Sequence, residues 1–348
     1  MAKNYHEQLD IKNTKIVRER LLEMPAFMGE FFRGIGESTS SNTRLGYAND
    51  LRLFFNYLMN HEEDFKNIKP EDFTLQVLDK VSTEHIESYM EFLTYYEKND
   101  LEYKNKAQGK SRKLSAVRTM FAYFFKKRKL SKNVAELVDF PTVHEKTIVR
   151  LEIDEVARLL DEIESGEKLT ERQQKFHQYT KKRDLAIVTL LLGTGIRVSE
   201  CVAIDMNHVD FEVAGVRITR KGGNEVVIYF GDEVYTTILD YFEERKKMIP
   251  EPGHEEALFL SIQNKRLTTR SVQLLVKKYS RLVTNLKNIS PHKLRSTYGT
   301  NLYRETGDIY LVADVLGHKD VNTTRKHYAE LEDSRRRKAA QYVKLRKD

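Results

Sequence analysis

Apolar residues recur at the spacing of an α-helix through much of the first 140 positions. One such run follows Ser41-Asn42-Thr43, whose side chains can cap a helix, and another follows Val81-Ser82-Thr83-Glu84. A third run contains Leu114, Val117, Met120, Phe121, Phe124 and Phe125. Core packing explains this aromatic stripe, so we expect a helical domain over residues 1–140.

The periodicity then lapses over residues 141–150, where Pro141 disfavours helix at the residue before it, and we expect a linker there. A new helix is expected from Leu151, and a strongly apolar one over Lys182–Leu192 that ends at Gly193 and Gly195. Between them, the polar stretch Ser165 to Thr180 is expected to form a loop or a weakly packed insertion.

Further on, the spacing changes from helical to alternating. Val216 and Ile218 alternate with polar residues, and a second β-branched run begins at Val226 after Gly222-Gly223-Asn224, which predicts a β-hairpin. Helices return from Glu233. The expected fold is mainly α with a small antiparallel β-sheet, in which a helical domain is followed by an α+β domain over residues 151–331. A basic tail covers residues 332–348.

Composition narrows the class of protein. The chain has 348 residues, a net charge of +7 and one cysteine, Cys201, which excludes an internal disulfide and a multi-cysteine metal site. The cysteine lies in an apolar stretch, so we expect a buried thiol. The longest apolar run, Leu185–Leu192, is far shorter than a membrane span, and residues 1–10 do not resemble a signal peptide. We therefore expect a cytoplasmic protein.

The layout of the charge indicates a nucleic-acid partner more strongly than its total does. Residues 103–135 contain eleven Lys or Arg and no acid, and residues 136–167 contain ten acids and three bases. A solvated helix face is the plain alternative. If the basic run instead meets DNA phosphates, its contact residues are expected to be Lys110, Arg112, Lys113, Arg118, Lys126, Lys127 and Arg128.

Several residues of the second domain carry groups suited to phosphodiester chemistry. His292 and Arg295 are three apart after Ser290-Pro291, so both would lie on one face near a helix start. Arg197 follows a Gly-Thr-Gly turn, although it could equally form an ion pair with Glu200. Lys221 is expected at the hairpin tip, where a solvated lysine is the commoner outcome.

Cleaving a phosphodiester requires a nucleophile, donors for the non-bridging oxygens and a proton for the leaving oxygen. Tyrosine can attack phosphorus and conserve the bond energy in a covalent intermediate. Two arginines suit the phosphate, because each guanidinium matches two oxygens. Tyr328, ten residues beyond His318, is one of eighteen tyrosines, and composition alone does not select it.

Together these segments resemble the catalytic domain of the tyrosine recombinases, the integrase family. The resemblance rests on Thr194 to Glu200, on His292-Lys293-Leu294-Arg295, and on Leu316-Gly317-His318 followed by Tyr328. It covers about residues 150–331, and the basic helical domain resembles the family's core-binding, DNA-binding domain. One departure is Ser296, where the family commonly has a second histidine.

The resemblance implies a role for each matching residue. Tyr328 would be the nucleophile that forms a 3′-phosphotyrosyl link, and Lys221 would be the general acid toward the 5′ oxygen. Arg197 and Arg295 would hold the phosphate, His292 would assist proton transfer, and His318 would bond to the phosphate. No metal and no other cofactor is implied.

Within the family the chain is most similar to the Xer branch, and there to the XerS group of streptococci and lactococci. This implies a homo-tetramer on two dif-like sites in double-stranded DNA, activation by an FtsK-type DNA translocase, and resolution of chromosome dimers before cell division. The tail would dock as a helix on a neighbouring protomer or touch DNA, with a disordered basic tail as the alternative.

Three other functions remain open at this stage. A mobile-element or prophage integrase would use the same chemistry on attachment sites. A non-catalytic DNA-binding protein could retain the fold, and a type IB topoisomerase would share the chemistry but need no specific site.

Overall fold

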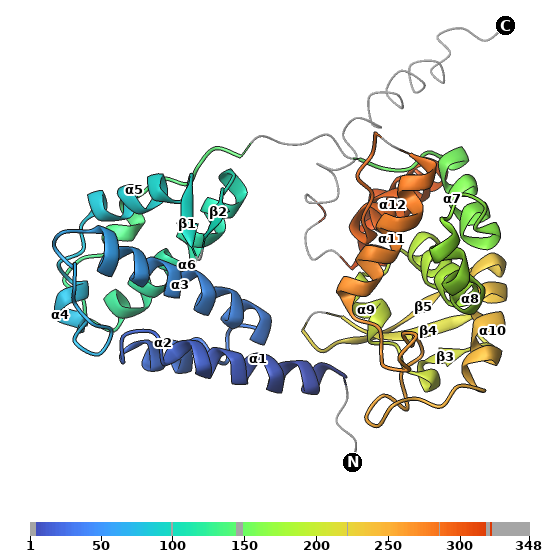
Figure 1. Cartoon of the computed structure of the whole chain (residues 1–348), viewed down its shortest axis with the longest axis horizontal. Helices are drawn as coiled ribbons and strands as arrows, with labels where there is room; N and C mark the ends of the chain where they lie inside the picture. The colour runs from blue at the N-terminus through green and yellow to red at the C-terminus, as the bar shows by residue number, and fades with distance from the viewer. Residues whose placement is uncertain are drawn as a thin grey trace, which may run out of the picture. The chain divides into compact units, whose positions relative to one another are not determined.

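The computed structural model describes residues 5–98, 100–143, 149–220, 222–284, 286–317 and 321. The chain divides into two compact units, Met1–Lys146 and Thr147–Asp348 (Figure 1). The division falls inside the segment 141–150, which the sequence predicts to be a linker. Each unit has its own hydrophobic core and is described by itself.

The first unit is built almost entirely from helices. Its elements are α1 (Tyr5–Leu21), α2 (Met28–Gly34), α3 (Ser41–His61), α4 (Leu75–Leu78), α5 (Thr83–Phe92), β1 (Tyr96–Lys98), β2 (Leu101–Tyr103), α6 (Ala107–Lys126) and the short 3-10 helix η1 (Val134–Leu137). Helix α3 packs against both α1 and α6. It begins after Ser40, whose hydroxyl accepts a hydrogen bond from the backbone N–H of Thr43.

The core of this unit is rich in aromatic rings, as the helical spacing predicts. Phe54, Phe55 and Phe124 are fully buried, and Phe27 meets Phe124 edge to face with 5.3 Å between ring centres. Phe125, however, is 46% exposed, so the predicted apolar stripe of α6 ends one residue earlier.

A two-stranded hairpin interrupts these helices, and the expectation of helices alone up to residue 140 is wrong here. Tyr96 pairs with Tyr103 across β1 and β2, and their rings stack with 5.2 Å between centres. Asp100 in the turn has a φ of 58°, a left-handed conformation that Asp adopts more readily than most residues.

The second unit combines helices with one small sheet. Its elements are α7 (Ile153–Ser165), α8 (Glu171–Thr194), α9 (Val198–Val202), the 3-10 helix η2 (Met206–His208), β3 (Val209–Asp210), β4 (Gly215–Thr219), β5 (Glu225–Tyr229), α10 (Asp232–Arg245), α11 (Thr269–Val283), α12 (Pro291–Thr306) and α13 (Ile309–Leu316). These elements confirm the predicted mainly helical fold with a small antiparallel sheet.

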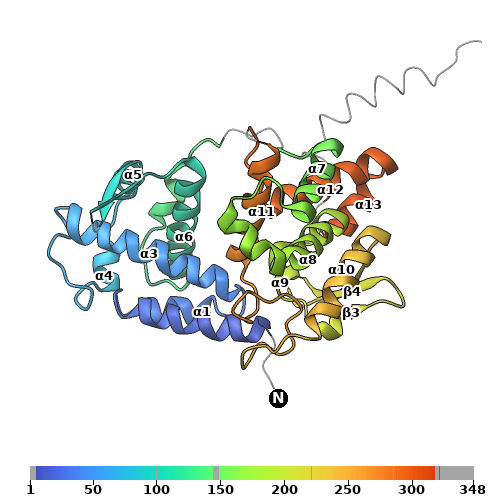
Figure 2. The ribbon, with the colours of Figure 1, turned by 45° about the vertical axis from the view of Figure 1, so that its right-hand side comes forward.

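Helix α8 is the central element of this unit, because α7, α10 and α12 all pack against it (Figure 2). Its apolar half, from Ala186 to Leu191, is almost entirely buried, as is the Cys201 thiol that follows in α9. The sheet has the order β3-β4-β5 and is antiparallel throughout. Val216 lies opposite Ile228 and Ile218 opposite Val226, which confirms the predicted hairpin.

The segment Ser165 to Thr180 is largely helical, so the prediction of a loop or weakly packed insertion is wrong. Thr170 caps α8, and the helix runs unbroken from Glu171. The first half of α8 is mostly polar, but its residue His177 is buried, with 7% exposure, and contacts α7. The ring Nε2 lies 2.7 Å from the Ile163 carbonyl oxygen, which can only accept, so Nε2 carries the hydrogen.

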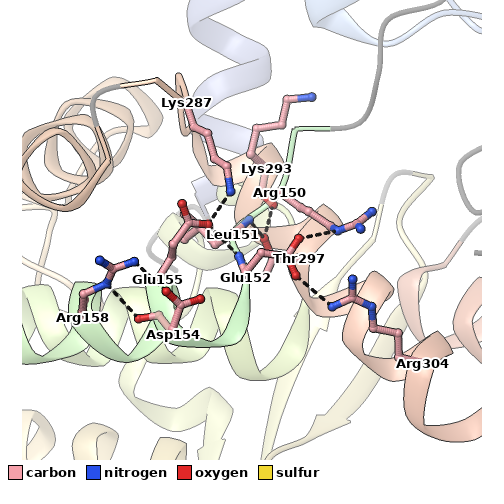
Figure 3. Close-up of polar contacts among 10 residues, drawn as sticks. All are labelled: Arg150, Leu151, Glu152, Asp154, Glu155, Arg158, Lys287, Lys293, Thr297 and Arg304. Carbon is pink, nitrogen blue, oxygen red and sulfur yellow. Dashed lines mark hydrogen bonds and ion pairs between the residues drawn. The ribbon is translucent and has the colours of Figure 1, made fainter. Parts of the chain in front are cut away.

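The start of this unit is tied to α12. The backbone N–H of Leu151 donates to the Thr297 hydroxyl at 3.0 Å, and Arg304 Nη1 pairs with Glu152 at 3.1 Å (Figure 3). Lys287, just before α12, reaches the Glu155 carboxylate. Thr297 lies on the helix that carries His292 and Arg295, so these contacts hold that helix in place.

A search of the described residues finds no helix with the length and apolar character needed to cross a bilayer.

The contact between Gly166 and His177 predicts a measurable packing effect. Gly166 has a φ of 70°, and an added Cβ would lie 2.7 Å from the His177 ring. Gly253 has a φ of 85° but open space around it, so Gly253→Ala is a matched control that adds backbone strain alone. The control should lower the free energy of unfolding by about 1–2 kcal/mol.

Gly166→Ala should cost roughly 1–3 kcal/mol more than the control, because it also overpacks the α7–α8 contact. The measurement is urea denaturation of the full chain, with the transition of the second unit identified by hydrogen exchange in α7 and α8. Equal losses in the two variants would contradict the packing contact.

Candidate active site

The end of α8 sets the position of Arg197. The helix stops at Gly195, whose φ of 63° turns the chain, and Arg197 then caps the short helix α9. The Arg197 backbone N–H donates to Glu200 Oε2 at 2.7 Å and its Nη1 to Oε1 at 2.8 Å. Glu200 is only 4% exposed, so this buried carboxylate fixes both the backbone and the guanidinium of Arg197.

Helix α12 positions His292 and Arg295. It begins after Ser290 with Pro291 in the first turn, as predicted, and it places the two side chains one turn apart. His292 is exposed, whereas Arg295 is 5% exposed. Arg295 Nη1 donates to the Gly195 carbonyl at 2.6 Å, and Nη2 donates to the Leu316 carbonyl. Arg295 therefore links the ends of α8 and α13.

The C-terminal end of α13 is where the arginines meet. Arg295 bonds to the carbonyl of Leu316, and Arg197 Nη2 donates to that of Gly317 at 3.3 Å. A third arginine, Arg220 of the β4–β5 turn, donates to the carbonyls of Asp314 at 3.3 Å and Val315 at 2.8 Å. Three guanidinium groups thus bond to four consecutive carbonyls, which carry the negative end of the helix dipole.

Two glycines permit this close packing. A Cβ on Gly195 would lie 2.4 Å from the Tyr298 ring and 2.9 Å from Leu316, and a Cβ on Gly317 would lie 2.4 Å from Arg220 Nη1. Both residues also have positive φ, of 63° and 62°. The neighbours of Gly195 therefore come from α12 and α13.

This arrangement is suited to binding an anion. The carbonyls that Arg220 and Arg295 bond to are neutral, so these bonds orient the guanidinium groups without cancelling their charge. Arg197 is paired with Glu200 as the alternative interpretation foresaw, yet its side chain remains 35% exposed. A guanidinium has five N–H donors, so Arg197 retains donors for a phosphate oxygen.

Three other candidates, Lys221, His318 and Tyr328, lie outside the described residues. The tail 332–348 lies outside them as well. The described residues therefore bring together Arg197, Arg295 and the helix turn of His292, and the sequence places Lys221 and His318 directly after the bonded residues Arg220 and Gly317.

Comparison with known proteins identifies the family. The model of the phage integrase family matches residues 149–335, more than half of the chain, and the model of the phage integrase N-terminal SAM-like domain matches residues 30–129. The chain belongs to the phage integrase family. It is thus a tyrosine recombinase, an enzyme of DNA strand breakage and rejoining.

Its relatives include Xer recombinases. Tyrosine recombinase XerC of Caldanaerobacter subterraneus is 31% identical over 343 residues, which cover 94% of this chain and 90% of the relative. Tyrosine recombinase XerD of Staphylococcus epidermidis is 26% identical over 294 residues, covering 84% of this chain and 90% of the relative. The recombinase is therefore Xer-like over nearly its whole length.

Solved structures share the fold. XerH bound to a palindromic difH substrate has a TM-score of 0.62 at 17% identity, covering 88% of this chain and 81% of that one. The Tn1549 transposon integrase in complex with a circular intermediate DNA also has a TM-score of 0.62, at 20% identity, covering 88% and 97%.

The basic residues predicted for DNA contact differ in their surroundings. Lys113 is 8% exposed and donates to Asn105 at 2.8 Å, and burial lowers the pKa of its ammonium. Arg112 pairs with buried Asp50, and Lys110 donates to Thr94 at 2.6 Å. Arg118 lies over the Phe140 ring with 4.7 Å to its centre.

Lys126, Lys127 and Arg128, at the end of α6, are all exposed. Within the described part of the chain their side chains have no hydrogen bond or ion pair, whereas the neighbouring Lys129 pairs with Glu30 at 2.6 Å. These three cations are therefore the most available of the predicted set.

Two contributors to the site were missed by sequence reasoning. Glu200 was considered only as a competing partner for Arg197, and Arg220 was not considered. The signal for Glu200 was its three-residue spacing from Arg197 in a capping position. No sequence signal pointed to Arg220, because its partners are backbone carbonyls almost a hundred residues away.

The Glu200 contact predicts a loss of activity without a loss of fold. Glu200→Ala removes two charge-assisted hydrogen bonds to Arg197. If the equivalent of one of them, about 1.5–3 kcal/mol, acts in the transition state, DNA cleavage should slow by roughly 10- to 100-fold. Single-turnover cleavage of a DNA substrate measures this rate.

The matched control is Glu162→Ala, because Glu162 is equally buried, at 4%, but accepts from the backbone of Lys168 at 2.9 Å. This control should reduce stability and leave the cleavage rate of folded protein nearly unchanged. A similar slowing in both variants would mean that Glu200 acts only on stability.

Proposed function

We propose that this recombinase exchanges DNA strands at a specific site through a 3′-phosphotyrosyl intermediate, with Tyr328 as the nucleophile. The supporting observation is that Arg197 and Arg295, from distant parts of the chain, bond to the adjacent carbonyls of Gly317 and Leu316. Guanidinium groups held in this way can bind one phosphate without reorganising during the reaction.

The Tyr328 oxygen forms a bond to phosphorus, and its proton leaves with the assistance of His292. The bond from phosphorus to the 5′ oxygen breaks, and the Lys221 ammonium donates a proton to that oxygen. His318 hydrogen-bonds to the phosphate. Attack by a 5′-hydroxyl reverses the step, restores the tyrosine and rejoins the DNA, and neither a metal nor a cofactor takes part.

The first unit would supply binding to double-stranded DNA. Its exposed cations Lys126, Lys127 and Arg128 would contact phosphates, and Lys110, Arg112, Lys113 and Arg118 belong to the same proposed surface. The partners of Arg112 and Lys113 favour a structural contribution from these two residues, whereas the other contacts would give salt-sensitive affinity.

We further propose that the cellular role is resolution of chromosome dimers at a dif-like site in the cytoplasm, as the XerS group would do. The support is the likeness to XerC and XerD proteins over 84–94% of the chain. A homo-tetramer on two sites, an FtsK-type translocase as activator and a docking or DNA-binding role for the tail 332–348 belong to the same proposal.

A mobile-element integrase is the second candidate, because the fold likeness to the Tn1549 transposon integrase equals that to XerH. Mapping the genomic DNA that the purified protein binds and cleaves separates the two roles. A chromosomal site near the replication terminus would support dimer resolution, and sites at the ends of a mobile element would support integration.

Replacing the proposed nucleophile tests the chemistry. Tyr328→Phe should leave DNA binding intact and abolish the covalent protein–DNA adduct on a nicked substrate, since phenylalanine has no oxygen to attack phosphorus. The control Tyr310→Phe changes a tyrosine that is 71% exposed on α13 and should still form the adduct. Denaturing gel electrophoresis detects the adduct, and an adduct with Tyr328→Phe would assign the nucleophile to another residue.

Neutralising the end of α6 tests the DNA surface. The triple variant Lys126→Gln, Lys127→Gln and Arg128→Gln should weaken DNA binding and reduce the slope of log K against log salt by roughly 3, at about 0.9 per phosphate contact. Lys129→Gln is the control, because the Glu30 carboxylate already pairs with that cation. Binding isotherms are measured at several salt concentrations. An unchanged slope of log K against log salt would mean that these three side chains do not contact DNA phosphates.

A further inference from the structure

Arg220 connects the β4–β5 turn to α13. Its backbone N–H donates to the Asn224 carbonyl at 2.8 Å, and its own carbonyl accepts from Gly223 at 3.0 Å, so its backbone belongs to the closed turn. Its side chain leaves the turn and bonds to Asp314 and Val315 at the end of α13. One residue thus joins two elements that are about ninety residues apart in the sequence.

Packing supports the same connection. The Arg220 guanidinium occupies the space beside Gly317 in which any other residue would place its Cβ, 2.4 Å from Nη1. Elsewhere the turn is open, because a Cβ on Gly222 or Gly223 would have no neighbour within 4 Å. Within the described residues, Arg220 therefore supplies the side-chain attachment of this turn to α13.

The attachment point is shared with the phosphate-binding arginines. Arg220 donates to the carbonyls of residues 314 and 315, Arg295 donates to that of residue 316, and Arg197 donates to that of residue 317. Neighbouring carbonyls in one helix end have a fixed relative position. The bonds of Arg220 therefore set the position of the turn relative to Arg197 and Arg295.

We propose that Arg220 is a positioning residue for protonation of the leaving 5′ oxygen. The inference rests on the proposed function, in which Lys221, the next residue in the chain, is the general acid. A general acid must lie within hydrogen-bond reach of its target, and a displacement of about 1 Å can slow a reaction by about 100-fold. By holding the turn on α13, Arg220 places the following ammonium relative to the bound phosphate.

The side chain at position 220 must be a planar fork for this purpose. A guanidinium can donate to two successive carbonyls at once, whereas an ammonium is a point donor on a flexible stem. Arg220→Lys keeps the charge and should retain part of the attachment. Arg220→Ala removes both bonds and leaves space beside Gly317.

A substrate whose leaving atom is sulfur tests the proposal. In a DNA with a 5′-bridging phosphorothioate, the bond from phosphorus to sulfur breaks and the electron pair leaves on a thiolate that needs no proton. Single-turnover adduct formation is compared on this DNA and on ordinary DNA, for full-length protein with Arg220→Ala, Arg220→Lys, Lys221→Ala or the control Arg217→Ala. Arg217 is exposed on β4, the strand that leads into the turn, and it alternates there with the buried residues Val216 and Ile218.

On ordinary DNA, Arg220→Ala should slow adduct formation by about 10- to 100-fold, with a smaller loss for Arg220→Lys. On the sulfur substrate, Arg220→Ala, Arg220→Lys and Lys221→Ala should each react at a rate within about threefold of the unaltered protein. The control Arg217→Ala, a surface change, should stay within about threefold on either DNA. Because binding and phosphate contacts are needed on both substrates, a purely structural defect would slow both equally.

The outcomes separate the two proposals. If the sulfur substrate rescues Lys221→Ala but not the Arg220 variants, Arg220 has no role in placing the acid, and the acid role of Lys221 stands. If Arg220→Ala reacts normally on ordinary DNA, the positioning proposal is wrong. If Lys221→Ala is not rescued, the proposed acid itself is wrong, and the inference built on it is lost as well.

Discussion

The site depends on the bonding of three arginines to the C-terminal end of α13. A helix leaves its last carbonyls without partners inside the helix, and these oxygens carry partial negative charge. Here Arg220, Arg295 and Arg197 satisfy the carbonyls of four consecutive residues, 314 to 317. The helix end thereby becomes a template that sets where the guanidinium groups lie, before any DNA is bound.

The template depends on side chains that pack closely against the glycines at the helix ends. Arg295 lies between the end of α8 and the end of α13, and it bonds to Gly195 on one side and Leu316 on the other. A side chain at residue 195 would collide with Tyr298 and Leu316, and a side chain at residue 317 would collide with Arg220. The buried apolar half of α8 anchors the arrangement, and the contacts of Thr297 and Arg304 to the start of α7 hold α12 against it. The packing of these helices therefore fixes the positions of the helix ends that form the site.

Much of this could be predicted from the sequence, and the limits have physical causes. Helical periodicity, the Gly-Gly-Asn hairpin and the Ser290-Pro291 helix start are local signals, and each lies where the sequence predicts it. The polar first half of α8 was missed because its stability comes from a cap and one buried histidine, His177. The β1–β2 hairpin was missed because its strands are only three residues long and all three residues of β2 are exposed, so no alternation marks it.

The arrangement of the candidate site was less accessible, because its bonds use backbone atoms that have no sequence signature. Motifs selected Arg197, Arg295 and His292, but the role of Arg220 depends on carbonyl groups, which every residue has. Glu200 was recognised as a partner of Arg197, yet only its 4% exposure shows that it fixes the guanidinium. The spacing of motifs therefore identifies candidate residues of the site, whereas the structure is needed to identify the contacts that orient their side chains.

Basic residues of both units pair with buried carboxylates, in contrast to the arginines that bond to the carbonyls at the end of α13. Buried Asp184 accepts bonds from Arg183 and Tyr279 and pairs with Lys278, so a carboxylate offsets the cations there. Asp50 does the same for Arg112 in the first unit. Such clusters stabilise packing but have little charge left for a ligand.

At the end of α13 the carbonyls that accept from Arg220, Arg295 and Arg197 belong instead to neutral amides. Glu200 is the carboxylate bound to Arg197. The bonds to these carbonyls orient the guanidinium groups without themselves neutralising the positive charge. A site for the proposed phosphate, whose negative charge would increase during attack, needs both fixed geometry and positive charge. Bonding arginines to a helix C-terminus supplies the two together, which a salt-bridge network would not.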